Sequence, residues 1–347
     1  MLVLGIETSC DDTGVAIVED GVTVRSQAVG SQLELHQPYG GVVPEIAARA
    51  HLELMLPTID EALVEAGATY DDLDAVAVTV GPGLAGALLV GVAAAKAIAL
   101  AQGLPLIGVN HLEGHVCAAQ LAYGLLERPL VALVISGGHT SIVLADAEGE
   151  FRTVGSTIDD AAGEAFDKIA RFLGLPYPGG PQIDAAAKEG NPHAIAFPRP
   201  MLRDGFDVSL SGLKTAVIRE LRRRDAAGED VHIPDVAASF QEAVVDVQVH
   251  KTMAAAEQFG VKQVVLVGGV AANSRLRARM GAACTDRGLD LLTPHPALCT
   301  DNGAMIAAAG WNHLMAGERS GMDVGVDPNL PLEQLLVGTA DAGGPAA

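Results

Sequence analysis

Short apolar segments alternate along the chain with longer stretches in which apolar residues recur every three or four positions. Apolar runs of about four to eight residues between glycine or polar turns predict strands, and the longer periodicity predicts helices. The predicted strands are 2–6, 15–18, 22–26, 75–80, 106–109, 130–136, 139–145 and 264–267. The predicted helices are 44–66, 84–101, one from residue 111 onward, 159–173, 233–259 and 303–315. This alternation predicts an α/β protein with mixed sheets and helices on both faces.

The pattern of the first strands occurs a second time. A strand, a tight turn and a strand fill residues 2–18, and the same succession opens again after Pro129. A chain of 347 residues also exceeds what one core usually holds. We therefore expect two related lobes: residues 1–128, completed by 302–337, and residues 129–301. Residues 338–347 are expected to form a flexible tail.

Composition narrows the class of protein. Apolar residues make up 49% of the chain and charged residues 19%, which argues against disorder. The formal net charge of −21 repels polyanions, so any nucleic-acid substrate requires a local basic surface or a basic partner.

The cysteines and the first residues of the chain indicate the cellular compartment. The four cysteines form no CxxC pair, as expected in a reduced compartment. The start MLVLGIETSCDD lacks a basic segment and is typical of a first strand, not of a signal peptide. The apolar stretch 84–101 contains Lys96 and is expected to be a buried helix, not a membrane span. We expect a cytoplasmic protein that does not enter a membrane.

The sequence HLEGH, residues 111–115, is the sharpest candidate for metal binding. His111 and His115 are four residues apart, so on a helix both imidazoles share one face and can reach one cation. An HxxxH pair is also common among ordinary surface or core histidines. Glu113 falls on another face, unlike the glutamate of the HExxH proteases.

A third ligand is needed, and Asp301 is the candidate. It lies just before a predicted helix, where aspartate often acts only as an N-cap. Sequence spacing alone does not join it to the histidines. Two histidines and one carboxylate would form an open site suited to iron(II) or zinc.

Glycine turns and carboxylates suggest a nucleotide site. The segments 136–140 and 268–273 each follow a strand, and such turns let backbone N–H groups approach phosphate, although each could be a simple tight turn. Asp160, Glu164 and Asp167 recur at helical spacing, and Asp184 follows another glycine loop. These carboxylates could bind ribose hydroxyls or a substrate ammonium group, or form a solvated face.

Basic residues gather in three groups that could contact RNA phosphates or simply be solvated. The groups are Arg199, Arg203 and Lys214; Arg219, Arg222, Arg223 and Arg224; and Arg275, Arg277 and Arg279.

Many motifs in a fixed order carry a resemblance. They are GIETSCDDT, YGGVVPEIAAR, GPGLAGALLVG, HLEGH, SGGHT, DDAAGEAFDK, YPGGP, FPRPM, SGLKT, GGVAANSRLR and CTDNGAMIA, from residue 5 to residue 307. With them the chain resembles the tRNA N6-adenosine threonylcarbamoyltransferase family, whose bacterial catalytic subunit was once labelled an O-sialoglycoprotein endopeptidase. The resemblance implies the two-lobed actin/Hsp70-like ATPase fold.

The resemblance also implies roles for individual residues. Segments 7–14 and 135–140 would bind phosphate, and 266–277 would bind adenosine. The implied metal ligands are His111, His115 and Asp301, usually with one iron or zinc ion. The residues implied to line the nucleotide and substrate pocket or to hold the adenylate are Val134, Ile135, Ser136, Gly137, Gly138, Asp167, Gly180, Asp184 and Asn273. Asp11 is the candidate general base, from its place in the phosphate turn, and Ser136 and His139 are the other catalytic candidates.

The implied reaction is an acyl transfer from threonylcarbamoyl-AMP to N6 of adenosine 37 in tRNAs that read codons beginning with A. A metal that polarises the carbamoyl carbonyl would help a weak amine nucleophile. The implied partners are the tRNA anticodon loop, an inactive paralogue and a small ATPase, and the cleft would hold threonylcarbamoyl-AMP, ATP or ADP.

Three other functions fit part of the pattern. A zinc metalloprotease would explain HLEGH but lacks a base at the required spacing. A small-metabolite kinase of the same fold would explain the aspartates of the first turn but needs no histidine pair. A non-catalytic binding subunit would not be expected to keep all three metal-ligand candidates.

Overall fold

The computed structural model describes residues 1–334, and it divides the chain into two compact units. Unit 1 contains Met1–Leu126 and the described residues from Thr300 onward, and unit 2 contains Glu127–Cys299. The boundaries differ by two residues from those expected from the sequence. The second boundary therefore places Asp301 in unit 1 together with the histidines, whereas the sequence assigned it to the other lobe. The expected flexible tail, 338–347, lies outside the described residues.

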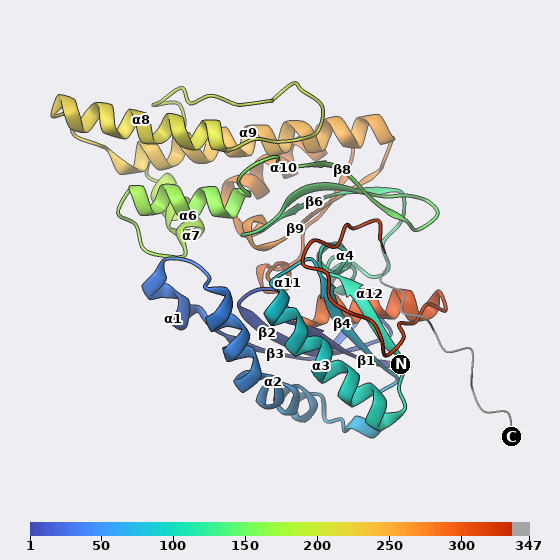
Figure 1. Ribbon diagram of the computed structural model, residues 1–347. Helices are drawn as coiled ribbons and strands as arrows, with labels where there is room; N and C mark the ends of the chain where they lie inside the picture. The colour runs from blue at the N-terminus through green and yellow to red at the C-terminus, as the bar shows by residue number, and fades with distance from the viewer. Residues whose placement is uncertain (335–347) are drawn as a thin grey trace, which may run out of the picture. The chain divides into compact units, whose positions relative to one another are not determined.

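Unit 1 is built on a five-stranded mixed sheet in the order β3-β2-β1-β4-β5 (Figure 1). The strands are β1 (Leu2–Glu7), β2 (Asp12–Glu19), β3 (Thr23–Ser31), β4 (Ala75–Gly81) and β5 (Leu106–Asn110). β1 pairs antiparallel with β2 and parallel with β4, and β4 pairs parallel with β5. The carboxyl ends of β1, β4 and β5 therefore meet at one edge.

Helices cover both faces of this sheet, because side chains alternate along each strand. Leu4 and Ile6 belong to one core cluster with residues of α2 and α3. Gly5 points the other way, where a Cβ atom would lie 2.1 Å from the carbonyl oxygen of Gly303 at the start of α12. The helices of unit 1 are α1 (Leu33–His36), α2 (Pro44–Ala66), α3 (Ala85–Gln102), α4 (His111–Cys117), α5 (Gln120–Tyr123) and α12 (Gly303–Met315).

Unit 2 repeats the topology of unit 1. Its sheet has the order β10-β9-β6-β7-β8, with β6 antiparallel to β7 and parallel to β9. The strands are β6 (Leu130–Ile135), β7 (Thr140–Ala145), β8 (Phe151–Ser156), β9 (Gln263–Val267) and β10 (Asp290–Leu292). The repeated opening in the sequence therefore corresponds to two sheets with the same strand order.

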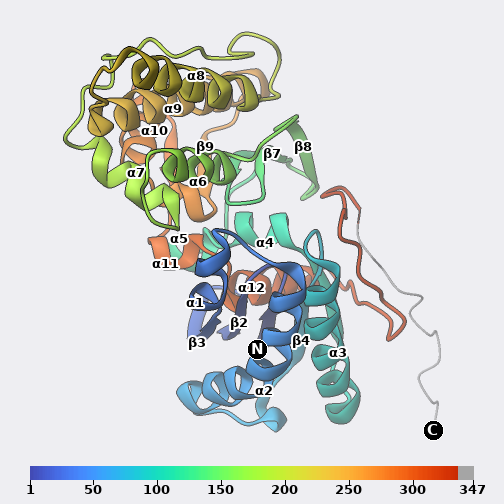
Figure 2. The same ribbon diagram turned by 60° about the vertical axis from the view of Figure 1, so that its left-hand side comes forward.

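The helices of unit 2 surround one apolar cluster that includes alternate residues of β6, such as Val131 and Leu133. They are α6 (Ala162–Phe172), α7 (Gly179–Ala187), α8 (Ser211–Ala227), α9 (Ile233–Phe259), α10 (Ser274–Thr285) and α11 (Pro296–Cys299). Figure 2 shows α8 running alongside α9. The strands β8 and β10 and the helices α7 and α8 were not expected from the apolar pattern.

α3 is long and apolar enough to cross a membrane by length and composition alone. Core helices of soluble proteins pass the same test, and α3 packs beside α2 and β4 with its buried residues facing them. The sequence predicted a buried helix. The structure shows a helix of which a third, 33%, is buried, with Leu89 and Leu100 exposed.

Candidate metal centre and nucleotide pocket

The two candidate metal-binding histidines lie at the carboxyl edge of the unit 1 sheet. β5 ends at Asn110, whose side chain accepts a hydrogen bond of 2.9 Å from the backbone N–H of Leu112 and so begins α4. His111 is the first residue of α4 and His115 follows one turn later. Both side chains are buried, His115 completely. The helix that the spacing required is therefore present.

Asp301 approaches the histidines from the start of α12. Asn302 is the N-cap of α12, since its side chain accepts a hydrogen bond from the backbone N–H of Met305. Asp301 is therefore not used as the N-cap. The close packing of Gly303 against Gly5 brings this end of α12 to the sheet edge, because any side chain at either position would collide with backbone.

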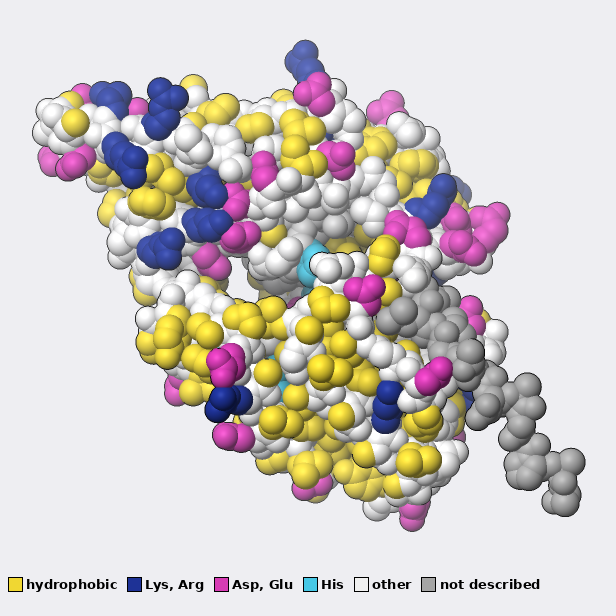
Figure 3. All heavy atoms as spheres, viewed as in Figure 1, with side chains coloured by type: hydrophobic (Ala, Val, Ile, Leu, Met, Phe, Trp, Pro, Cys, Tyr) yellow, Lys and Arg dark blue, Asp and Glu magenta, His cyan; other side chains and the backbone are white. Residues whose placement is uncertain are grey.

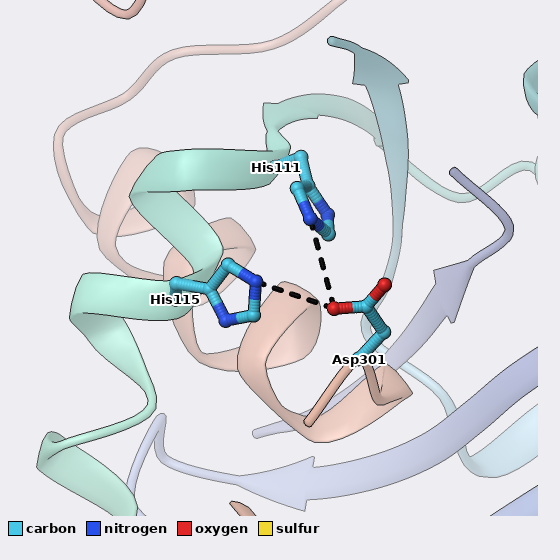
Figure 4. Close-up of side chains that lie close together, drawn as sticks. All are labelled: His111, His115 and Asp301. Carbon is cyan, nitrogen blue, oxygen red and sulfur yellow. Dashed lines mark ion pairs between the residues drawn. The ribbon is translucent and has the colours of Figure 1, made fainter. Parts of the chain in front are cut away.

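The three side chains converge (Figure 4). Asp301 Oδ1 lies 3.2 Å from His115 Nε2 and 3.7 Å from His111 Nε2. Two ligand atoms of a tetrahedral ion at bond lengths near 2.1 Å lie about 3.4 Å apart, so these separations suit one shared cation. All three ligand atoms lie within 4.8 Å of one another.

His115 gives the strongest indication that these residues fit a metal. Its ring is fully buried, Nδ1 has no hydrogen-bond partner among the described residues, and Nε2 faces Asp301 Oδ1 at 3.2 Å without a well-formed hydrogen bond. A buried polar group left unsatisfied is costly, and such groups in native proteins usually serve a further purpose. A divalent cation bound to Nε2 would give this nitrogen a partner.

Glu7, which the sequence pattern did not reveal, supports His111 from behind. Its carboxylate is fully buried and lies 2.9 Å from His111 Nδ1. Thr79 donates a hydrogen bond of 2.6 Å to the same carboxylate, and the backbone N–H of Ser9 donates another. A carboxylate that holds Nδ1–H makes Nε2 the nitrogen that can bind a cation, an arrangement common behind metal-binding histidines. The signal that could have found it is a glutamate that ends an otherwise apolar strand.

The same charges act on the proton of His111. Burial lowers the pKa of His111, but Glu7 and Asp301 outweigh burial and raise the pKa to about 9. A cation that binds Nε2 must displace this proton. Metal binding at this site is therefore expected to release a proton near neutral pH.

Glu113, the glutamate within HLEGH, faces away from the histidine pair. It is buried and lies 3.0 Å from His313 Nε2 of α12. Glu318 contacts the other ring nitrogen of His313, at 2.5 Å. Glu113 is thus committed to a buried ion pair and is not available as a base beside a metal-bound water.

Asp11, the candidate general base, is half-buried in the turn between β1 and β2. Burial, Asp11 and Asp301 together raise the pKa of Cys10, so this thiol stays protonated. Burial and the neighbouring charge of Asp11 raise the pKa of Asp12 to about 6. The turn thus brings the acidic side chains of Asp11 and Asp12 together, and the role of Asp11 as a base stays a prediction.

Unit 2 contains a cavity of about 410 Å³ beside the carboxyl ends of β6 and β9. Glycine turns follow both strands. Gly268 has φ +93°, and a Cβ there would lie 2.4 Å from the Ile135 carbonyl oxygen, so only glycine fits. The lining residues are Gly137, Gly163, Phe166, Asp167, Tyr177, Pro178, Gly180, Pro181, Asp184, Ala185, Lys188, Gly269, Val270, Ala272 and Asn273.

Most residues expected to hold an adenylate are brought together here. Asp167, Gly180, Asp184 and Asn273 all line the cavity. Asp167 accepts a hydrogen bond from the backbone N–H of Gly179, and Asp184 accepts one of 2.8 Å from the Ser274 hydroxyl. Asn273 caps α10 and binds Gln241, a residue without an evident sequence signal. Aromatic and apolar walls with a few convergent polar groups are typical of a small-molecule site.

The residues at the end of β6 and in the glycine turn that follows it divide between the cavity and the core. Gly137 lines the cavity, whereas Gly138 is exposed beside it. Val134 and Ile135 do not line this cavity, because both side chains are fully buried within β6. Ser136 Oγ accepts a hydrogen bond of 3.1 Å from the backbone N–H of His139 and so closes the turn. Catalytic roles for Ser136 and His139 stay predictions.

The acidic row at the start of α6 separates into two environments. Asp167 faces the cavity, but Asp160 pairs with Lys214 and with Lys168, the latter at 2.8 Å. Burial raises the pKa of Asp160, but these lysines outweigh it and hold the pKa below its usual value. Glu164 also pairs with Lys168. Helical spacing alone therefore grouped residues that the fold uses differently.

Known proteins match this chain over nearly its whole length. Residues 23–308 match the family model described as tRNA N6-adenosine threonylcarbamoyltransferase. Proteins of that name from Geotalea uraniireducens and Symbiobacterium thermophilum are 52% and 54% identical to this chain. The alignments cover 96% and 95% of this chain and 98% and 97% of the relatives.

Solved structures share the fold at low sequence identity. HypF from T. kodakarensis has a TM-score of 0.61 at 17% identity, over 91% of this chain and 48% of that one. The (R)-2-hydroxyglutaryl-CoA dehydratase component A of Acidaminococcus fermentans has a TM-score of 0.54 at 15% identity, over 91% and 99%. With the repeated mixed sheets, these neighbours show the expected two-lobed actin-like ATPase fold.

Proposed function

Because the chain belongs to the tRNA N6-adenosine threonylcarbamoyltransferase family, we propose that it transfers a threonylcarbamoyl group to N6 of an adenosine in tRNA. The acceptor is adenosine 37 in tRNAs that read codons beginning with A, and the donor is threonylcarbamoyl-AMP. The convergence of His111, His115 and Asp301 is the structural observation that supports this proposal most directly.

Unit 1 supplies the candidate metal centre of the reaction. His111, His115 and Asp301 would hold one iron(II) or zinc ion, with Glu7 fixing the orientation of His111. A bound divalent cation supplies Lewis-acid polarisation of a carbonyl oxygen, which makes the carbon more susceptible to a weak amine nucleophile. The buried surroundings of the histidines reduce screening by water and strengthen such an electrostatic effect.

Unit 2 supplies the candidate site for the adenylate, or for ATP or ADP. Asp167 and Asp184 can accept hydrogen bonds from ribose hydroxyls, and Tyr177 offers apolar surface to a base. The turns at Gly137 and Gly269 present backbone close to the cavity, where phosphate oxygens can accept hydrogen bonds from N–H groups. Ser136 shapes the first of these turns.

Two alternative functions are weakened by particular observations. A metalloprotease of the HExxH type needs the glutamate as a base beside the metal, and Glu113 is instead paired with His313. A small-metabolite kinase has no use for the convergent histidine pair. Family membership favours neither.

The proposed setting is the cytoplasm, together with an inactive paralogue and a small ATPase. The exposed apolar side chains on α2 and α3 support contact with a protein partner, because such groups gather where a surface becomes covered. They are Leu52, Leu56, Val64, Leu89 and Leu100. Figure 3 shows hydrophobic surface over this part of unit 1.

The test is reconstitution of the transfer. Unmodified tRNA, threonylcarbamoyl-AMP and the protein are incubated, and the tRNA nucleosides are analysed by mass spectrometry. We expect threonylcarbamoyladenosine to accumulate, and its formation to stop when a chelator removes the metal. Transfer absent with every combination of metal and partners would contradict the proposal, as would cleavage of a protein substrate under the same conditions.

A further inference from the structure

The basic residues of this acidic chain are unevenly distributed. Eighteen of the 22 lysines and arginines lie in unit 2, although the chain as a whole carries a net charge of −21. A polyanionic substrate would therefore meet the least repulsion on unit 2. The three basic groups of the sequence all belong to this unit, and the structure shows which of their cations are already paired.

The arginines of α10 are committed within the fold. Arg275 and Arg279 both bind the buried carboxylate of Glu242, and Arg279 also binds Asp246 at 3.0 Å. Arg277 donates hydrogen bonds to the backbone carbonyls of Ala271 and Pro294. An anion that took any of these guanidinium groups would have to break an existing interaction.

The basic group of Arg199, Arg203 and Lys214 also provides few unpaired cations. Arg199 pairs with Asp246 at 2.8 Å, and Lys214 pairs with Asp160. Arg203 is exposed but stands next to Asp204 in an irregular segment. Neither this group nor α10 presents two free cations on one element.

α8 is different, because its sequence SGLKTAVIRELRRRDAA carries five basic residues and two acidic ones. Glu220 pairs with Arg223 and Arg224. Arg219 and Arg222 are exposed and three residues apart, so they share one face. Neither has an ion-pair or hydrogen-bond partner within residues 1–334.

A third free cation lies on the neighbouring helix. α6 packs against α8, and Arg171 in the last turn of α6 is exposed and likewise lacks a partner in the described part of the chain. Figure 3 shows lysine and arginine side chains gathered over α6 and α8. We define Arg171, Arg219 and Arg222 as the α6/α8 basic surface.

We propose that the α6/α8 basic surface binds the phosphate backbone of the RNA substrate. This inference rests on the proposed function, which requires a strongly acidic protein to hold a polyanion. An unpaired, exposed guanidinium can bind phosphate without losing an internal partner, and it does so in a bidentate manner. Such contacts are independent of base sequence and position the RNA.

The test compares two double variants that change the net charge equally. Arg219→Glu with Arg222→Glu alters the α6/α8 basic surface. Lys262→Glu with Arg287→Glu is the control, since both residues are exposed and Lys262 follows the far end of α9, a helix about 40 Å long. The KM for tRNA in the transfer reaction and the Kd for tRNA by fluorescence anisotropy are measured from 50 to 200 mM salt.

We expect the α8 variant to raise KM and Kd for tRNA about tenfold or more, with kcat at saturating tRNA preserved. The slope of log Kd against log salt should fall by about 0.7 to 0.9 for each phosphate group that the variant no longer binds. The control should change both constants less than threefold. The double variant Arg219→Ala with Arg222→Ala should also raise KM and Kd for tRNA, but by less. Because alanine introduces no new charge into α8, this variant controls for misfolding caused by the glutamates.

Two results would overturn the inference. The first is unchanged tRNA affinity in the α8 variant, or an equal weakening in both double variants, which would indicate only a general charge effect. The second is intact tRNA affinity together with failure to bind a protein partner, which would assign the surface to an acidic protein instead. Failure of the proposed function looks different, because the unaltered protein itself would then form no threonylcarbamoyladenosine.

Discussion

The two units have the same sheet order but different chemistry at the corresponding edge. In unit 1 the carboxyl ends of β1, β4 and β5 carry buried Glu7, buried Thr79 and, just beyond β5, His111. In unit 2 the carboxyl ends of β6 and β9 lead into turns at Gly137 and Gly268. Ligands in open α/β sheets bind beyond the carboxyl ends of the strands, and both candidate sites obey this rule.

The difference shows how one backbone arrangement can support two kinds of candidate site. Buried imidazole and carboxylate groups are placed to hold a small cation, but they fill the edge with side chains. Glycines have no side chains, so the corresponding edge of unit 2 keeps a cavity and a backbone that a larger ligand can approach. We therefore expect metal binding and nucleotide binding to be separable by mutation, which the His115 and Asp184 variants test directly.

Replacing His115 by alanine should have the largest effect. The variant loses one of two imidazole ligands, so we expect metal content near zero and transfer reduced by about a thousandfold or more. Nucleotide affinity, measured by calorimetry on the same sample, should stay within twofold of the unaltered protein. If the variant kept its metal, His115 would be excluded as a metal ligand.

The stability of unit 1 should also depend on pH, because His313 is buried between the carboxylates of Glu113 and Glu318. Burial lowers the pKa of His313, but Glu113 and Glu318 outweigh it and raise the pKa to about 9, above the ordinary 6.5. The protonated His313 between these carboxylates therefore stabilises the folded state by about 3 kcal/mol. This contribution to the unfolding free energy is fully present below pH 6.5 and is lost as the pH rises through 9.

His313→Gln tests that assignment. Urea unfolding of both proteins at pH 6, 7.5 and 9 should show a difference in unfolding free energy that shrinks with rising pH. A difference that stays constant across this range would mean that His313 does not titrate between the two carboxylates.

Glu7→Gln should weaken the metal site without removing a ligand. The amide can still contact His111 but no longer fixes the same tautomer, so we expect metal affinity to fall about 10- to 100-fold. Competition with a chromophoric chelator measures this. Glu7→Asp, which keeps the charge, should recover part of the affinity, and equal affinities in all three proteins would exclude the positioning role.

Asp184→Ala should have the smallest effect and act on the other unit. We expect nucleotide affinity to fall about tenfold through removal of a hydroxyl-accepting carboxylate, with metal content unchanged. The Pro181→Ala variant serves as control, because it changes another side chain in the wall of the same cavity and removes no hydrogen-bond acceptor. A coupled loss of metal in Asp184→Ala would show that the two sites are not independent.

The sequence predicted residues that are close together along the chain better than residues that only the fold brings together. The helical spacing of His111 and His115 and the two-lobed α/β class followed from residue patterns. Asp301 could be joined to the histidines only through the fold, because it lies 186 positions after His115 in the sequence.

The residues that the sequence pattern did not reveal share a physical reason. Glu7 lies 104 positions from His111, and a single glutamate at the end of an apolar strand shows no periodicity. α8 was not predicted because its polar, arginine-rich sequence has only a weak apolar stripe. Conversely, the spacing of Asp160 and Asp167 suggested one cluster, and lysine pairing separated them.

The most direct test of the central claim is a metal titration of the transfer reaction. Protein stripped by chelation is reloaded with iron(II) or zinc, and threonylcarbamoyladenosine is quantified at each step. The account predicts that activity rises linearly and saturates at one equivalent per chain, and that Asp301→Ala shows no rise. Full activity in metal-free protein, or saturation of the Asp301→Ala variant at the same level, would contradict it.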